Sequence, residues 1–247
     1  MKKRIETYGK GGVLEISGNP QETILYLKGK PIQYSWYAEV GTIWRYHIAQ
    51  GLKKKAVQLS KRVEEQLRRG VANEVEFSEI AEYFNSFFGY GTYEYGYYEL
   101  FEDIQWINIP ETEEYQSFDY YGGAIDISPT QNAINEEWVA EYKEQILTGL
   151  RPVIVLLHVE NSWMFHLLDG HHKFCAYQVA KIKPHAIIVT KLGSEYKTTK
   201  ETIDLARSMN CFRQDSLEHM EREKRNLRRY RNKKLVLEEA FRLIKGG

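Results

Sequence analysis

Two histidines, an aspartate and a lysine lie within five residues, in the stretch Asp169-Gly170-His171-His172-Lys173. An apolar run precedes this stretch and a helical pattern follows it, so we expect a helix to begin directly after the turn. The first turn of a helix has unpaired backbone N–H groups and the positive end of the helix dipole, which attract anions. Gly170 lets the backbone approach a ligand, and the three residues after it add side-chain donors. The stretch therefore favours a phosphate group, as in a nucleotide or another phosphorylated ligand.

A carboxylate lies at the same place, because Asp169 directly precedes the glycine. It is suited to cap the helix, to bind a cation such as Mg²⁺ or to accept a proton. Asp169 and His172 are thus candidate catalytic residues, and Asp169 is also the candidate metal ligand. The alternative is a helix start packed under a hairpin, with exposed histidines and no ligand.

The histidines as a group leave a transition-metal site open, since five of the seven fall between residues 158 and 185. Histidine is a common metal ligand. His158 and His166 are expected on adjacent antiparallel strands, however, where a packed pair is the ordinary result. Mg²⁺ bound through phosphates is favoured over Zn²⁺.

The composition is that of a soluble globular protein, with 247 residues, 43% hydrophobic and 28% charged. The 34 basic and 34 acidic residues cancel, so no global charge draws the chain to nucleic acid or to a membrane. The two cysteines fit neither a disulfide framework nor a paired metal motif, which favours a reducing compartment. No apolar run approaches the ~20 residues of a membrane helix, and the N-terminus lacks a signal-peptide core. We expect a cytoplasmic protein without a membrane partner.

The first hundred residues alternate between short apolar runs and turns, which predicts a β-meander followed by helices. A hairpin is expected across residues 18–20, and two further strands at 33–37 and 43–48. Helical spacing predicts one helix over 51–69 and a second that Ser78 caps. A tyrosine-rich passage then marks a loose boundary; the alternation of Tyr93, Tyr95 and Tyr97 favours a half-buried sheet surface over a base-stacking one.

The next hundred residues alternate strands with helices. Asn135 is expected to cap a helix that ends before Gly149. Buried strands are expected on both sides of the candidate turn, and from about residue 199 the chain is helical and highly charged. The expected ranges are strands at 104–109, 153–157, 163–168 and 185–190 and helices at 135–148 and 171–182.

This order of elements, from Phe101 to Lys191, resembles the ParB/sulfiredoxin superfamily. Its members read Asp/Ser-Gly-x-His/Arg-Arg with a small residue three positions on, which here is Asp169 to Lys173 and Ala176. The upstream Gly-x-x-Pro-Val-Ile-Val agrees in spacing. The five residues are most similar to the free serine kinases, whose motif is Asp-Gly-His-His-Arg. Lys173 replaces the last arginine and loses its bidentate fork, and His171 stands where sulfiredoxins have their catalytic cysteine, which argues against sulfinic-acid reduction.

The resemblance implies an α+β protein with a mixed-sheet core that binds ATP or another nucleotide with Mg²⁺. Gly170, His171, His172 and Lys173 would hold the phosphates. Kinase-like members place a glutamate after the first strand as general base, which favours Glu111 over its neighbours Glu113 and Glu114. The implied activity is phosphoryl transfer to a small-molecule acceptor or nucleotide hydrolysis. The expected segments are an N-terminal part, 1–97, the core, 98–195, and a charged helical tail, 196–247.

The alternative function is a nucleotide-gated DNA- or protein-binding module without catalysis. Lys224–Lys234 holds seven basic residues in eleven and no acid, which suits a nucleic acid. Flanking acids and a ragged apolar stripe favour instead a solvated helix that docks on the body or on a second subunit of a homo-oligomer. Asp126, in a glycine-rich turn, is expected to be structural, with contact to the ligand as the alternative.

Overall fold

The computed structural model describes residues 1–8, 12–37, 44–100, 104–107, 113–121, 125–195 and 199–209. It divides into two units, Met1–Tyr196 and Lys197–Gly247. The second unit contains one described helix, α5 (Thr199–Ser208). No helix in the described part of the chain is long and apolar enough to span a membrane. All the other described helices and strands belong to the first unit.

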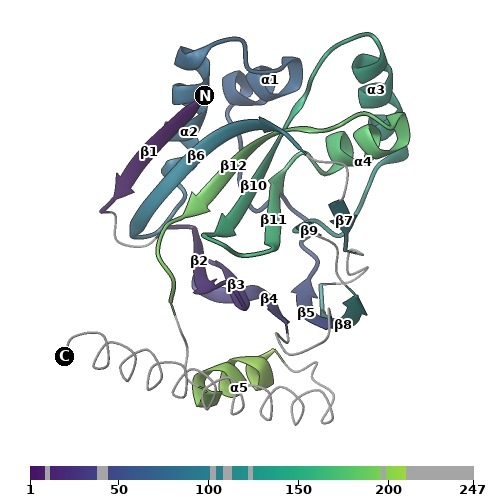
Figure 1. The fold of residues 1–247 in the computed structure, drawn as a ribbon. Helices are drawn as coiled ribbons and strands as arrows, with labels where there is room; N and C mark the ends of the chain where they lie inside the picture. Colours follow the sequence, from purple (N-terminus) through teal and green to yellow (C-terminus); the bar gives the residue numbers. More distant parts are fainter. Residues whose placement is uncertain are drawn as a thin grey trace, which may run out of the picture. The chain divides into compact units, whose positions relative to one another are not determined.

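A seven-stranded mixed sheet forms the centre of this unit (Figure 1). Strands β10 and β12 run parallel to each other, and β11 returns antiparallel to β10 and parallel to β9 and β7. The carboxyl ends of β7, β9 and β11 therefore meet at one edge, where the candidate turn follows β11. The strand order is β1 (Lys2–Thr7), β6 (Gly91–Glu99), β12 (His185–Lys191), β10 (Val153–Val159), β11 (Met164–Asp169), β9 (Ile125–Pro129) and β7 (Ile104–Trp106).

A second, five-stranded antiparallel sheet contains the predicted hairpin and the two strands expected after it. A later strand, from the middle of the chain, completes the sheet by pairing with β5. Its order is β2 (Leu14–Asn19), β3 (Glu22–Leu27), β4 (Lys30–Tyr37), β5 (Trp44–Gln50) and β8 (Tyr115–Tyr121). The prediction of an α+β fold with a mixed sheet is confirmed.

Four helices accompany the sheets: α1 (Lys61–Arg69), α2 (Glu74–Asn85), α3 (Glu136–Leu147) and α4 (His171–Ala180). The prediction of one helix over 51–69 is wrong in its first half. The N–H of Leu52 donates to the carbonyl of Thr130 and its carbonyl accepts from Asn132, so this segment is held beside the end of β9. Ser60 then caps α1 by accepting the N–H of Val63.

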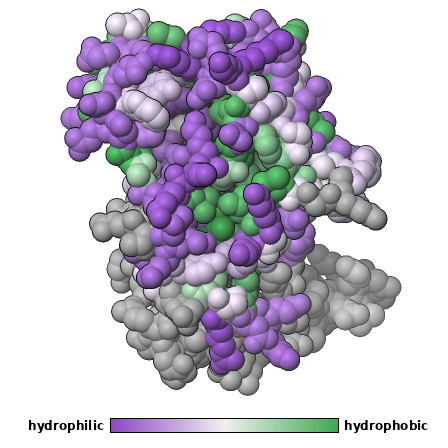
Figure 2. Space-filling view, turned by 180° about the vertical axis from the view of Figure 1, so that it is seen from behind, coloured by the Kyte–Doolittle hydropathy of each residue, from purple (hydrophilic) through white to green (hydrophobic). Residues whose placement is uncertain are grey.

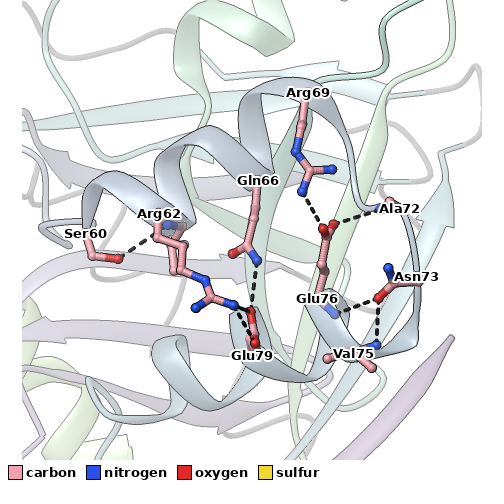
Figure 3. Close-up of polar contacts among 10 residues, drawn as sticks. Ser60, Arg62, Gln66, Arg69, Ala72, Asn73, Val75, Glu76 and Glu79 are labelled. Atoms are coloured by element: carbon pink, nitrogen blue, oxygen red, sulfur yellow. Dashed lines mark hydrogen bonds and ion pairs between the residues drawn. The ribbon is translucent and has the colours of Figure 1, made fainter.

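The second helix begins earlier than predicted, because Asn73 rather than Ser78 is its cap. The Asn73 side chain accepts the N–H groups of Val75 and Glu76, both at 3.0 Å (Figure 3). Ser78 lies inside the helix. The Asn135 cap of α3 is confirmed, with its side chain accepting the N–H groups of Glu137 and Trp138.

Ion pairs join α1 to α2 at the surface (Figure 3). The Arg62 guanidinium donates to both carboxylate oxygens of Glu79 at 2.6 Å, and the Gln66 amide donates to the same carboxylate at 3.0 Å. At the far end, Arg69 donates to one carboxylate oxygen of Glu76. These contacts clamp the two helices together on their water-exposed side.

Apolar residues alternate along the central strands and fill both faces of the seven-stranded sheet. Val153, Val155 and Leu157 pack on one face with the apolar sides of α1 and α2. Ile154 and Leu156 point to the other face, where the core includes Phe174 of α4. Figure 2 shows a hydrophobic area enclosed by hydrophilic residues on the side opposite the view of Figure 1.

The tyrosine-rich passage is an interior strand of this sheet, β6, and the boundary expected after residue 97 falls within it. Tyr93 and Tyr95 are buried in the core, where Tyr93 stacks on Phe88. Because β6 pairs with both β1 and β12, residues from the first hundred and from the core segment share one sheet.

Candidate functional site

The turn between β11 and α4 depends on Gly170. Its backbone is left-handed, with φ 97° and ψ 30°. A Cβ atom at this position would lie 2.8 Å from Ile154 Cγ2 and 3.1 Å from Ile154 Cα. Glycine is required by both the dihedral angles and the close packing on β10. Helix α4 consequently starts immediately after the strand.

The side chains of Asp169 and Lys173 form a buried ion pair one helical turn apart. The Lys173 ammonium donates to Asp169 Oδ2 and to the carbonyl of Val153, each at 3.0 Å, and both side chains are 5% exposed. Burial raises the pKa of Asp169, but the charges of Lys173 and Lys55 outweigh it and the pKa lies below its ordinary value. The carboxylate is therefore ionised and engaged within the protein.

His171 joins the start of α4 to the end of β9. Its Nε2 atom accepts the backbone N–H groups of Thr130 at 3.0 Å and Gln131 at 3.2 Å. The ring is buried, which lowers its pKa to about 3, so it is neutral with its proton on Nδ1. The side chain expected to donate to a ligand thus accepts from the chain itself.

His172 belongs to the same corner and is half-buried. Its ring meets the indole of Trp138 edge to face, with centroids 4.9 Å apart. Burial and the charge of Lys55 lower its pKa, so the imidazole is neutral near pH 7 and can accept a proton. Trp138, on α3, is 52% exposed beside it.

Lys55 is a member of this corner that no sequence pattern indicated. Its ammonium lies 3.5 Å from Asp169 Oδ1 and 3.5 Å from Glu64 Oε1, and its side chain is 40% exposed. The segment that carries it was predicted to be helical, but the contacts of Leu52 with the end of β9 and the burial of Ala56 and Val57 bring it here. The short lysine run at 53–55 was the one available signal.

The first turn of α4 differs from those of the three preceding helices. Ser60, Asn73 and Asn135 each cap their helix through the side chain, whereas Gly170 offers none. The first intrahelical bond runs from the N–H of Phe174 to the carbonyl of Gly170 at 2.8 Å. The backbone N–H groups that come before Phe174 in the first turn of α4 therefore have no side-chain cap. They lie next to Lys55 and His172. This arrangement suits an anion.

The other candidate residues are not part of this corner. Asp126 is buried between the two sheets, where it pairs with Arg45, whose guanidinium lies 4.3 Å over the ring of Trp163. Glu111 and the basic segment Lys224–Lys234 lie outside the described residues.

Two histidines of the sheets, His47 and His166, are fully buried. His47 bridges the sheets through Ser35 at 2.7 Å and Ser128 at 2.8 Å, and burial lowers its pKa to about 3. His166 bonds Gln33 of β4, and burial again lowers its pKa to about 3. His158, on the adjacent strand, stacks on Phe165 and bonds Thr190 at 2.8 Å, so it packs with these residues rather than with His166.

Within the described residues, no group of three or more His, Cys, Asp or Glu side chains is arranged to hold a metal ion. Asp169, the predicted metal ligand, faces two ammonium groups instead. The corner thus combines backbone N–H donors, one partly exposed lysine and one neutral histidine. No protein-family model, curated protein or solved structure matches this chain.

Proposed function

We propose that the Asp169–Lys173 corner binds the phosphate groups of a nucleotide. The observation that carries the proposal is the start of α4, which has no side-chain cap and lies beside Lys55 and His172. Backbone N–H groups at a helix start bind phosphate oxygens, and the helix dipole favours their charge. The resemblance to nucleotide-binding proteins in the same five residues supports this choice of ligand.

The proposal divides the motif by role. His172 and the backbone N–H groups of His171 and Lys173 contact the phosphate, while the side chains of His171 and Lys173 hold the turn in place. Because Lys173 already balances Asp169, Lys55 can exchange its long contacts for a phosphate oxygen. Gly170 keeps the first turn against β10.

The proposed reaction is phosphoryl transfer to a small acceptor or hydrolysis of the nucleotide, which needs positioning and charge neutralisation. His172 is the proton acceptor in this scheme, since its neutral ring is half-buried at the corner. The described residues do not fit a protein-built Mg²⁺ site, because Asp169 is paired with lysines. We therefore assign Mg²⁺ no step.

The test is a thermal-shift series with ATP, ADP, CTP, GTP and AMP, each with Mg²⁺. A ligand that binds only the folded state stabilises it by about 2.7 kcal/mol at a hundredfold excess over Kd. Wild type should show this shift with at least one nucleotide. Lys55→Ala and His172→Ala should lose most of it.

Lys54→Ala is the matched control, because Lys54 is an exposed neighbour of Lys55 in the same segment. It should retain the full shift. The absence of a shift with every nucleotide, or an equal loss in the control, would contradict phosphate binding at this corner. A shift without phosphate release or transfer would favour the non-catalytic binding module.

A further inference from the structure

Strand β1 is the outermost strand at one side of the seven-stranded sheet (Figure 1). It pairs with β6 along all six of its residues without a bulge, and no strand in the described part of the chain pairs with its other side. An edge strand presents a row of backbone N–H and C=O groups to any strand that can align with it. Because β1 contains neither a proline nor a bulge, its open side is regular enough to pair.

The register with β6 decides which backbone groups of β1 point outward. The N–H of Tyr97 donates to the carbonyl of Met1, so these two residues form a hydrogen-bonded pair of the ladder. Such pairs alternate along antiparallel strands. The odd-numbered residues of β1 therefore bond β6, and the even-numbered ones turn their N–H and C=O groups to the open side. These outward residues are Lys2, Arg4 and Glu6.

The side chains of the outward residues are exposed, whereas those of the odd-numbered residues lie toward α2. Lys3 donates to Glu82 of α2 at 2.6 Å, and Thr7 donates to Asn85 at 2.9 Å. Arg4 has no ion-pair partner among the described residues. The contacts with α2 thus hold β1 in place, while the Arg4 guanidinium can pair with an acid on another chain.

A second copy of this chain is the partner that the edge fits. Two identical edges related by a twofold axis run antiparallel, and only the outward residues can form the new hydrogen-bonded pairs. One register sets Arg4 opposite Glu6 on both sides of the axis, with Ile5 opposite Ile5 between them. A shift of this register in either direction sets Arg4 against Arg4 or Glu6 against Glu6. Because like charges directly opposite are unfavourable, the charges select the first register.

We propose that β1 pairs with β1 of a second copy, with Arg4 opposite Glu6, so that the two seven-stranded sheets form one continuous sheet. The same register sets Lys2 opposite Tyr8, whose side chain is 75% exposed. The paired strands are short and their charges face water, so the dimer is weak and depends on protein concentration. It leaves the nucleotide corner free, since β6, β12 and β10 separate β1 from β11.

The test is analytical ultracentrifugation of the full chain over a wide range of concentrations. The mean mass of wild type should rise from one chain toward two, and the Kd should increase in high salt, which screens exposed charges. Arg4→Glu and Glu6→Arg each set like charges opposite each other twice, so each should raise the Kd at least about tenfold. The double variant, Arg4→Glu with Glu6→Arg, restores the unlike pairs in reverse order and should associate as wild type does.

Lys28→Glu is the control, because it reverses an exposed charge in the β3–β4 turn. It should leave the Kd unchanged. Amide hydrogen exchange gives a second readout: at high concentration the N–H of Arg4 should exchange more slowly in wild type than in Glu6→Arg, whereas the N–H of Ile5, which bonds β6, should be protected in both. A wild type that stays a single chain at every concentration, or a double variant that associates no better than the single ones, would overturn the proposal.

Discussion

The corner at Asp169 and the α1–α2 surface both join acidic side chains to basic ones, but they differ in access to water. At the corner, Asp169 and Lys173 are buried and depend on each other. On α1–α2, Arg62 and Glu79 make shorter contacts, at 2.6 Å, yet face solvent (Figure 3). Water can replace a lost partner at the surface and not in the interior. Burial, rather than the number of contacts, should therefore decide how strongly each pair affects stability.

The largest effect is expected from Asp169→Ala, which leaves the Lys173 ammonium buried without its carboxylate. The free energy of unfolding should fall by about 3–5 kcal/mol, as measured by urea denaturation. The double variant Asp169→Leu with Lys173→Met removes both charges and should recover most of the loss. A loss below about 1 kcal/mol in the single variant would mean that the pair behaves as a surface contact.

Gly170→Ala should follow, because it combines an unfavourable dihedral with overlap on Ile154. The free energy of unfolding should fall by about 2–4 kcal/mol from the strained dihedral and the overlap together. Gly149→Ala provides the matched case, since Gly149 has φ 101° and no atom near its absent Cβ. In Gly149→Ala the free energy of unfolding should fall by only about 1–2 kcal/mol. Equal losses in the two variants would show that packing on β10 contributes nothing.

Acid should weaken the interior while leaving the α1–α2 pairs intact. His47 and His166 have pKa values of about 3 when folded, against about 6.5 unfolded, so the unfolded chain binds more protons below pH 6.5. Stability is complete above pH 6.5 and falls as the pH drops toward 3. Between pH 7 and pH 5 each histidine should reduce the free energy of unfolding by about 2 kcal/mol.

Urea denaturation at both pH values checks this prediction. A His47→Gln variant should show a smaller pH dependence than wild type, by the share of one histidine. Identical pH dependence in the two proteins would exclude His47 as a source of the effect.

The smallest effect is expected from Arg62→Ala, which breaks the exposed pair with Glu79. The loss should stay below about 1 kcal/mol and should shrink in high salt, which screens exposed charges. A loss as large as that of Asp169→Ala would remove the distinction between the two regions.

Much of the fold could be predicted because many of its helices and strands follow from local patterns of apolar spacing and capping residues. Short apolar runs between turns predicted most strands of both sheets, although not β1, β8 or β9, and Asn135 capped α3 as expected. The helix over 51–69 was predicted from spacing alone, and the contacts of Leu52 with the end of β9 overrode that spacing. Ser78 was chosen as a cap because it precedes an apolar run, but Asn73 begins the helix a turn earlier.

The candidate site was predicted less completely, because a motif lists residues without stating which ones face each other. The sequence by itself determined the strand–glycine–helix turn, since Gly170 is the residue that its left-handed backbone allows. Only the tertiary structure decided that His171 accepts from β9, that Lys173 pairs inward and that Lys55 arrives from a distant segment. The physical reason is that pairing and burial depend on which distant segments fold together, such as those that carry Thr130 and Lys55, whereas a turn depends on adjacent residues alone.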